Sequence, residues 1–65
     1  MENKLRQFRE EEGWSVLELA AKSGVPVETI RRMEKMESFE GVEPICILKV
    51  ARPFGKLASE IFEKG

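Results

Sequence analysis

The sequence predicts an all-α fold, a small bundle of four to five helices, and three observations support this prediction. The 65 residues are too few to build a second hydrophobic core, so we expect residues 1–65 to form a single domain. Strong helix formers are frequent, and apolar residues recur at helical spacing in successive segments. Glycine and proline interrupt these segments at short intervals, which indicates several short helices rather than a long one.

The first helix is predicted from Met1 to Glu12. Leu5 and Phe8 stand three residues apart and give it a narrow apolar face. Gly13 can adopt the left-handed conformation that ends a helix. We therefore expect Trp14 to fold back on Phe8, as in a Schellman ending.

The second helix begins with a capping signal at Ser15-Val16-Leu17-Glu18. In a capping box the serine hydroxyl accepts from the backbone N–H three residues on, and the glutamate accepts from the backbone N–H of the serine. Trp14 and Leu19 flank this box as a hydrophobic staple. A helix from about Val16 to Lys22 follows, and Ser23-Gly24 ends it.

The third helix follows almost at once and ends near Lys35. Pro26 has a φ suited to a first helical turn, and Glu28 lies where the helix dipole favours an anion. Ile30 and Met33 recur at helical spacing. Two short helices joined through a glycine form an αα-corner, with Ala20, Gly24 and Val25 at the crossing.

The C-terminal half allows two interpretations at residues 45–50. The run Ile45-Cys46-Ile47-Leu48 is β-branched enough to form a strand. A helix is favoured, because Ile47, Val50, Ala51 and Phe54 then share one core face. Pro53 removes a backbone donor, so this helix should end or kink there.

The composition excludes most enzyme classes. The chain has no histidine and a single cysteine, and it lacks a glycine-rich phosphate loop or a carboxylate pair in apolar surroundings. We expect no catalysis, cofactor, metal or small-molecule substrate. Cys46 is expected to be a small buried hydrophobe or a dimer contact. No segment predicts a membrane span or a secretory signal, so a cytoplasmic protein is expected.

The net charge of −1 argues against the simplest kind of nucleic-acid binder, because phosphate contacts favour a basic excess. The acidic excess, however, lies outside the αα-corner. Glu37, Glu40 and Glu43 cluster just before Pro44, whereas the segment from Val27 to Met36 carries a local charge of +1.

Several segments resemble the helix-turn-helix of the lambda-repressor-like, or XRE/Cro, family. These segments are Phe8–Ser15, Glu18-Leu19-Ala20, Ser23-Gly24-Val25 and Glu28–Glu34, and the helix-turn-helix spans about 16–35. Leu48–Gly55 and Ser59–Phe62 resemble the fourth and fifth helices of that family. The resemblance implies a sequence-specific, repressor-like regulator that binds double-stranded DNA as a homodimer, with its third helix in the major groove.

The resemblance also implies roles for individual residues. Val27, Glu28 and Arg32 match base-facing positions, and Thr29 can reach phosphate or a base edge. Val16 matches a position that contacts the DNA backbone, although valine cannot donate that hydrogen bond. Arg9 and Glu34 match an ion pair between the first and third helices. The groups that remain to bind phosphate are Arg31, Arg32 and Lys35, with Lys4 as a further candidate.

Three of these residues also have a purely structural interpretation. Val27 can serve only to cover the start of the third helix. Glu28 is already explained by the helix dipole, and Arg32 can pair with Glu28 one turn earlier. The chain also departs from the family after Glu34, where Lys35–Glu40 replaces the usual Asn-Gly and basic residues. The expected phosphate clamp is therefore missing.

Exposed apolar residues predict a homodimer surface at Ile45, Leu48, Leu57 and Ile61. Two other functions stay open. A protein-interaction module or antitoxin-like adaptor on the same fold would explain the acidic loop and the apolar Val16 and Val27. Gly24–Arg32 also resembles the MerR or excisionase winged helix, but no paired strands are predicted after it.

Overall fold

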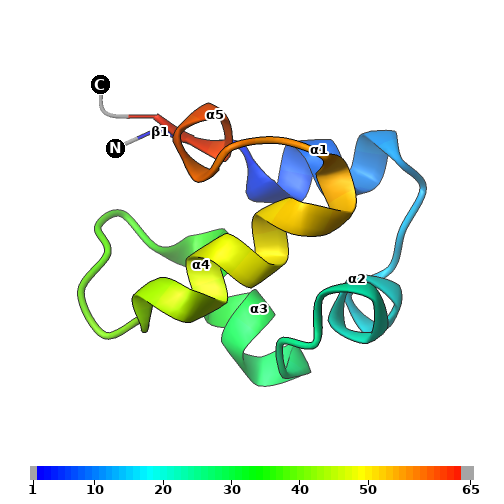
Figure 1. Ribbon diagram of the computed structural model, residues 1–65, viewed down its shortest axis with the longest axis horizontal. Helices are drawn as coiled ribbons and strands as arrows, with labels where there is room; N and C mark the ends of the chain where they lie inside the picture. The colour runs from blue at the N-terminus through cyan, green and yellow to red at the C-terminus, as the bar shows by residue number, and fades with distance from the viewer. Residues whose placement is uncertain (1, 64–65) are drawn as a thin grey trace.

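The computed structural model describes residues 2–63 and confirms the all-α prediction (Figure 1). The helices are α1 (Leu5–Glu11), α2 (Val16–Ser23), α3 (Val27–Lys35), α4 (Pro44–Ala51) and α5 (Ala58–Ile61). A 3-10 helix, η1 (Arg52–Phe54), continues α4, and two short strands, β1 (Glu2–Asn3) and β2 (Phe62–Glu63), lie at the two ends of the described chain.

The N-terminal end of α1 is where the prediction was wrong. The helix begins at Leu5, and β1 pairs antiparallel with β2, with Glu2 opposite Glu63 and Asn3 opposite Phe62. The backbone N–H of Lys4 donates to the carbonyl of Ile61 at 2.8 Å. Residues 2–4 therefore bind the C-terminal segment and do not extend α1. Helix propensity does not reveal such a long-range pairing. Met1, at the start of the predicted helix, lies outside the described residues.

The end of α1 has the predicted Schellman geometry. Gly13 has a φ of +74°, and the Trp14 N–H donates to the Arg9 carbonyl at 3.1 Å. Trp14 was expected to pack on Phe8, and the structure links the two rings through a third ring, that of Phe54. The Phe54 ring centre lies 5.2 Å from that of Trp14 and 6.4 Å from that of Phe8.

The corner between α2 and α3 forms as the sequence predicts. The Ser15 hydroxyl accepts from the Glu18 N–H at 3.1 Å, and the Glu18 carboxylate accepts from the Ser15 N–H at 3.3 Å. Gly24 then caps α2 with a φ of +75°, and its N–H donates to the Ala20 carbonyl. The next residue, Val25, is buried and fixes the angle between the two helices.

The segment over residues 45–50 is a helix rather than a strand. Pro44 stands in the first turn of α4, where its missing N–H has no helical partner in any case. The α-helix ends at Ala51 and tightens into η1, which contains Pro53, as expected for a proline at that point. The fifth helix covers Ala58–Ile61, one residue earlier than the family resemblance implies, because Phe62 belongs to β2.

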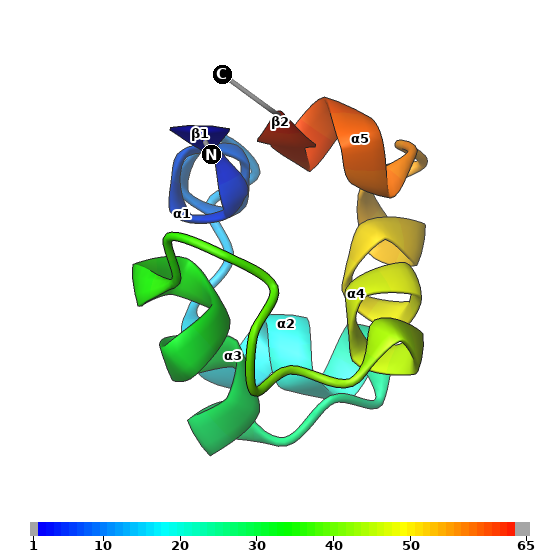
Figure 2. The ribbon, with the colours of Figure 1, turned by 90° about the vertical axis from the view of Figure 1, so that its left-hand side faces the viewer.

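The hydrophobic core is shared by all five helices. In Figure 2, α1 and α3 lie on one side, α4 and α5 on the other, and α2 closes the space below them. The buried side chains of the core are Leu5, Leu19, Val25, Ile30, Met33, Ile47, Val50, Ala51, Ile61 and Phe62. Within residues 2–63, no helix has the length and apolar character needed to cross a membrane.

Candidate nucleic-acid interface

The outer face of α3 is exposed and basic. Successive helical residues are about 100° apart, so the buried Ile30 and Met33 direct one face of α3 into the core and leave the opposite face outward. That outer face carries Glu28, Arg31, Arg32 and Lys35, all of them exposed. Three cations against one anion give it a charge of +2.

The remaining residues expected to contact DNA lie at the edges of this face or away from it. Val27 begins α3 and Thr29 follows in the same turn, and both are half-buried. Val16 begins α2 and packs against the hydrophobic core, so much of its side chain is already in contact with protein. The structure thus brings the polar candidates together on α3 and leaves Val16 with a packing role.

Arg32 holds the loop between α3 and α4. Its Nη2 donates to the Gly41 carbonyl at 2.9 Å, while no ion pair with Glu28 occurs among residues 2–63. Gly41 has a φ of +78°, and a Cβ built there would lie 3.2 Å from Arg32 Nη2. Both properties favour glycine at this position. The loop carries Glu37, Glu40 and Glu43, all exposed, beside the cations of α3.

The ion pair between Arg9 and Glu34 joins α1 to the buried side of α3. Arg9 Nε lies 2.6 Å from Glu34 Oε2, and Nη2 lies 3.3 Å from Oε1, so the contact is bidentate. A third donor, Nη1, reaches the Trp14 carbonyl at 2.7 Å. The hydrogen bond that Arg9 donates to Glu34 raises the pKa of Arg9; burial opposes this shift, and the negative charges of Glu34 and Glu10 add to it.

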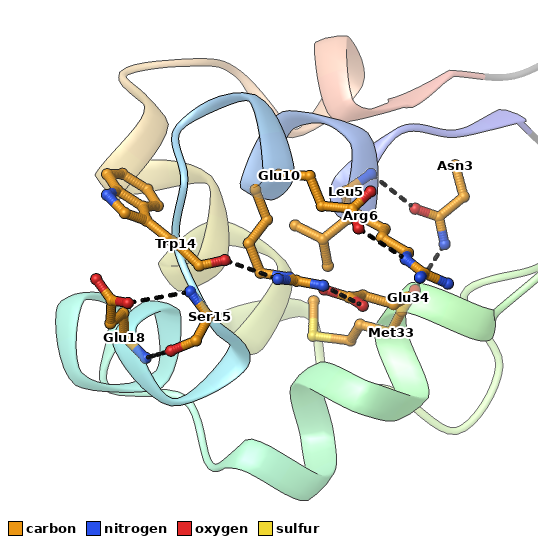
Figure 3. A network of polar contacts seen from close by, with 10 residues as sticks. Asn3, Leu5, Arg6, Glu10, Trp14, Ser15, Glu18, Met33 and Glu34 are labelled. Carbon is orange, nitrogen blue, oxygen red and sulfur yellow. Dashed lines mark hydrogen bonds and ion pairs between the residues drawn. The ribbon is translucent and has the colours of Figure 1, made fainter.

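Asn3 is a second polar anchor of α3, and the sequence analysis missed it. Its Nδ2 donates to the carbonyls of Met33 at 2.6 Å and Met36 at 3.2 Å, both at the C-terminal end of α3. Its Oδ1 accepts from the Leu5 N–H at 3.0 Å at the start of α1 (Figure 3). An asparagine two residues before a helix is a local signal for that last contact, but not for the contacts to α3.

Three of the four residues expected at a dimer surface are exposed. The expectation was wrong for the fourth, Ile61. Ile45, Leu48 and Leu57 are 50%, 58% and 67% exposed, whereas Ile61 is fully buried in the core. Burial of Ile61 follows from its place at the end of α5, directly before β2, which pairs with β1. Cys46 is half-buried and beside Thr29 and Arg32 in a shallow hollow between α3 and α4.

A further apolar surface appears at the start of α4. An open hollow of about 380 Å³ is lined by Phe39, Val42, Pro44, Ile47 and Leu48. Phe39, which is 40% exposed, also packs edge-on against Phe62 with ring centres 6.0 Å apart. We define the α4 face as the outward Ile45, Leu48, Lys49 and Arg52 of α4 and η1.

A family model described as helix-turn-helix matches residues 5–38 of the chain. The match covers α1, α2 and α3 and the start of the loop that follows. No curated protein and no solved structure matches the chain.

Proposed function

The chain belongs to the helix-turn-helix family of lambda-repressor-like, DNA-binding regulators, and from this premise we propose that it represses transcription as a sequence-specific homodimer. The observation that carries the proposal is the outer face of α3, which is exposed and has a charge of +2, while Arg9 and Asn3 hold the other side of the helix. An α-helix fits the major groove of B-DNA, where each base pair presents a distinct set of donors and acceptors.

On this proposal, each polar side chain of the outer face has a role. Arg32 donates to O6 and N7 of a guanine, which discriminates against other bases by about 1–3 kcal/mol. To do so, Arg32 must share or leave the Gly41 carbonyl, so base recognition and loop position are coupled. Glu28 accepts from the amino group of a cytosine, and Val27 contacts a thymine methyl group.

The remaining contacts go to the DNA backbone. Arg31 and Lys35 bind phosphate, and Thr29 donates to phosphate or to a base edge. The acidic side chains of the loop after α3 oppose this binding, because this loop follows α3 directly and its negative charges repel phosphate. The protein therefore holds DNA with few cations, and we expect log Kd to change with log salt concentration with a slope of magnitude about 3–5.

The experiment is a titration of duplex DNA at about 50 and 200 mM salt, combined with selection from random sequences. Arg32→Ala should relax specificity at one base position of the selected site, while Lys35→Ala should weaken binding to all sequences alike. Arg6→Ala, at an exposed position of α1 away from both α3 and α4, is the matched control and should leave binding nearly unchanged. Absence of binding at low salt would refute the proposal, and equal loss on all sequences would make Arg32 a phosphate contact.

A homodimer follows from the length of DNA that one copy can read. A single α3 reaches only a few base pairs, so two copies on half-sites about one helical turn apart would supply the specificity of a repressor. Exposed Ile45, Leu48 and Leu57 are apolar residues that a second copy could cover.

A second candidate function is a protein-interaction module, or antitoxin-like adaptor, on the same fold. The acidic loop and the apolar hollow beside it favour this candidate, because neither assists binding to DNA. The same titration separates the two functions, since an adaptor without DNA affinity would show no salt-dependent binding.

A further inference from the structure

The α4 face and the loop before it divide their charges between the two ends of a single helix. The acidic residues Glu37, Glu40 and Glu43 precede the N-terminal end of α4, and the basic Lys49 and Arg52 lie at its C-terminal end. All five are exposed, and none forms an ion pair within residues 2–63. Figure 1 shows the loop beside the start of α4, away from η1.

Apolar residues occupy the space between these two charged ends. Ile45 and Leu48 are at least half exposed, and Phe39 borders the hollow that Leu48 lines. A helix rises about 1.5 Å per residue, so the distance from Glu43 to Arg52 is about 13 Å along the axis. Leu48 is five residues after Glu43 and four before Arg52, close to the midpoint.

We propose that a second copy of the chain docks antiparallel along the α4 face, with Leu48 of both copies near the two-fold axis. In this arrangement Glu43 of each copy lies opposite Arg52 of the other, and Lys49, which is closer to the two-fold axis, reaches the acidic loop through its long side chain. The inference rests on the homodimer of the proposed function and names its interface. A two-fold interface requires a self-complementary patch, and an acidic end, an apolar centre and a basic end meet that requirement only in the antiparallel sense.

Other arrangements place like charges together. A parallel pairing would set the acidic loops of both copies against each other, which is unfavourable across an interface. A strongly basic partner would fit the loop but would be repelled by Lys49 and Arg52. The second copy is the occupant that satisfies both ends of the face.

The interface also bears on DNA binding. Glu40 and Glu43 lie in the loop that Arg32 holds beside the outer face of α3. Lys49 and Arg52 from the second copy would neutralise part of this acidic charge. Pairing then reduces the repulsion between the loop and phosphate, in addition to supplying a second α3.

The test uses two charge-reversal variants of the full chain and sedimentation equilibrium without DNA. Glu40→Lys/Glu43→Lys makes both ends of the face basic, and Lys49→Glu/Arg52→Glu makes both ends acidic. Each variant alone should dimerise at least tenfold more weakly than the wild type, and an equimolar mixture should recover dimers containing one copy of each. Glu11→Lys/Glu12→Lys reverses two exposed charges on and beside the last turn of α1 and should dimerise like the wild type.

Folding of each variant is checked by far-UV circular dichroism, and Leu48→Ser provides an independent variant that should also weaken pairing. A dimer that persists in both charge variants would refute the α4 interface while leaving the homodimer intact. Failure of the mixture to recover heterodimers would refute it as well. A monomeric wild type would refute the interface and the homodimer together, whereas the DNA titration would still test the role of α3.

Discussion

The ion pair between Arg9 and Glu34 gives the sharpest prediction for stability. The two side chains are only 11% and 10% exposed, and the pair is bidentate. Removing one partner of a buried ion pair costs about 3–5 kcal/mol, because the other charge stays in a poorly solvated place. We expect Arg9→Met and Glu34→Leu each to destabilise the protein by about 3 kcal/mol, since both groups retain some contact with water.

This loss is large for so short a chain. A stability of about 0.05–0.15 kcal/mol per residue corresponds to about 3–10 kcal/mol for the whole chain. A loss of about 3 kcal/mol lowers the melting temperature by about 12–24 °C at this size. The double variant should lose much less than the sum of the two single losses, because it leaves no unpaired charge.

The assay is urea unfolding followed by far-UV circular dichroism and by fluorescence of Trp14, whose carbonyl also binds Arg9. Arg6→Met is the matched control. Its partner Glu10 is one turn away and the two side chains are 68% and 57% exposed, so the loss should stay below about 0.5 kcal/mol. Single losses below about 1 kcal/mol, or losses that add in the double variant, would refute the reasoning.

The other predictions concern single anchors of the fold. Asn3→Ala removes three hydrogen bonds and should cost about 2 kcal/mol in urea unfolding, and Asn3→Asp should rescue little of it because an ionised carboxylate cannot donate to the Met33 and Met36 carbonyls. Ile61→Ala should cost about 2–5 kcal/mol by thermal melting, whereas Leu57→Ala, at an exposed position of the same segment, should change stability by less than about 0.5 kcal/mol. Ser15→Ala should cost about 1 kcal/mol by losing the cap of α2, and an unchanged melting curve would contradict the role of the capping box.

The parts of the fold that the sequence predicts are those determined by a few neighbouring residues. The capping box of α2, the glycine endings at Gly13 and Gly24, and the break after Ala51 all depend on chemistry within one or two helical turns. The core face of α4 was predictable for the same reason, because Ile47, Val50 and Ala51 repeat at helical spacing.

The contacts that the sequence does not predict join distant segments. Nothing near Asn3 indicates that its amide binds the carbonyls at the end of α3, some thirty residues on. The four residues of α5 are too few to show a period, so the burial of Ile61 depends on the packing of β2 against β1. Arg32 had a predicted partner one turn away in Glu28, but the fold brings the Gly41 carbonyl within its reach instead.

The antiparallel pairing of β1 with β2 brings the two ends of the described chain side by side. A peptide linker of a few residues could join these two ends, and the circular chain could then be cut at Ser38–Gly41, in the loop between α3 and α4, without cutting a helix. In such a circular permutant α4 would come first and α3 last, with the same residues in the core. If this permutant folds to the same core, the order of the helices along the chain does not determine the shape of the fold.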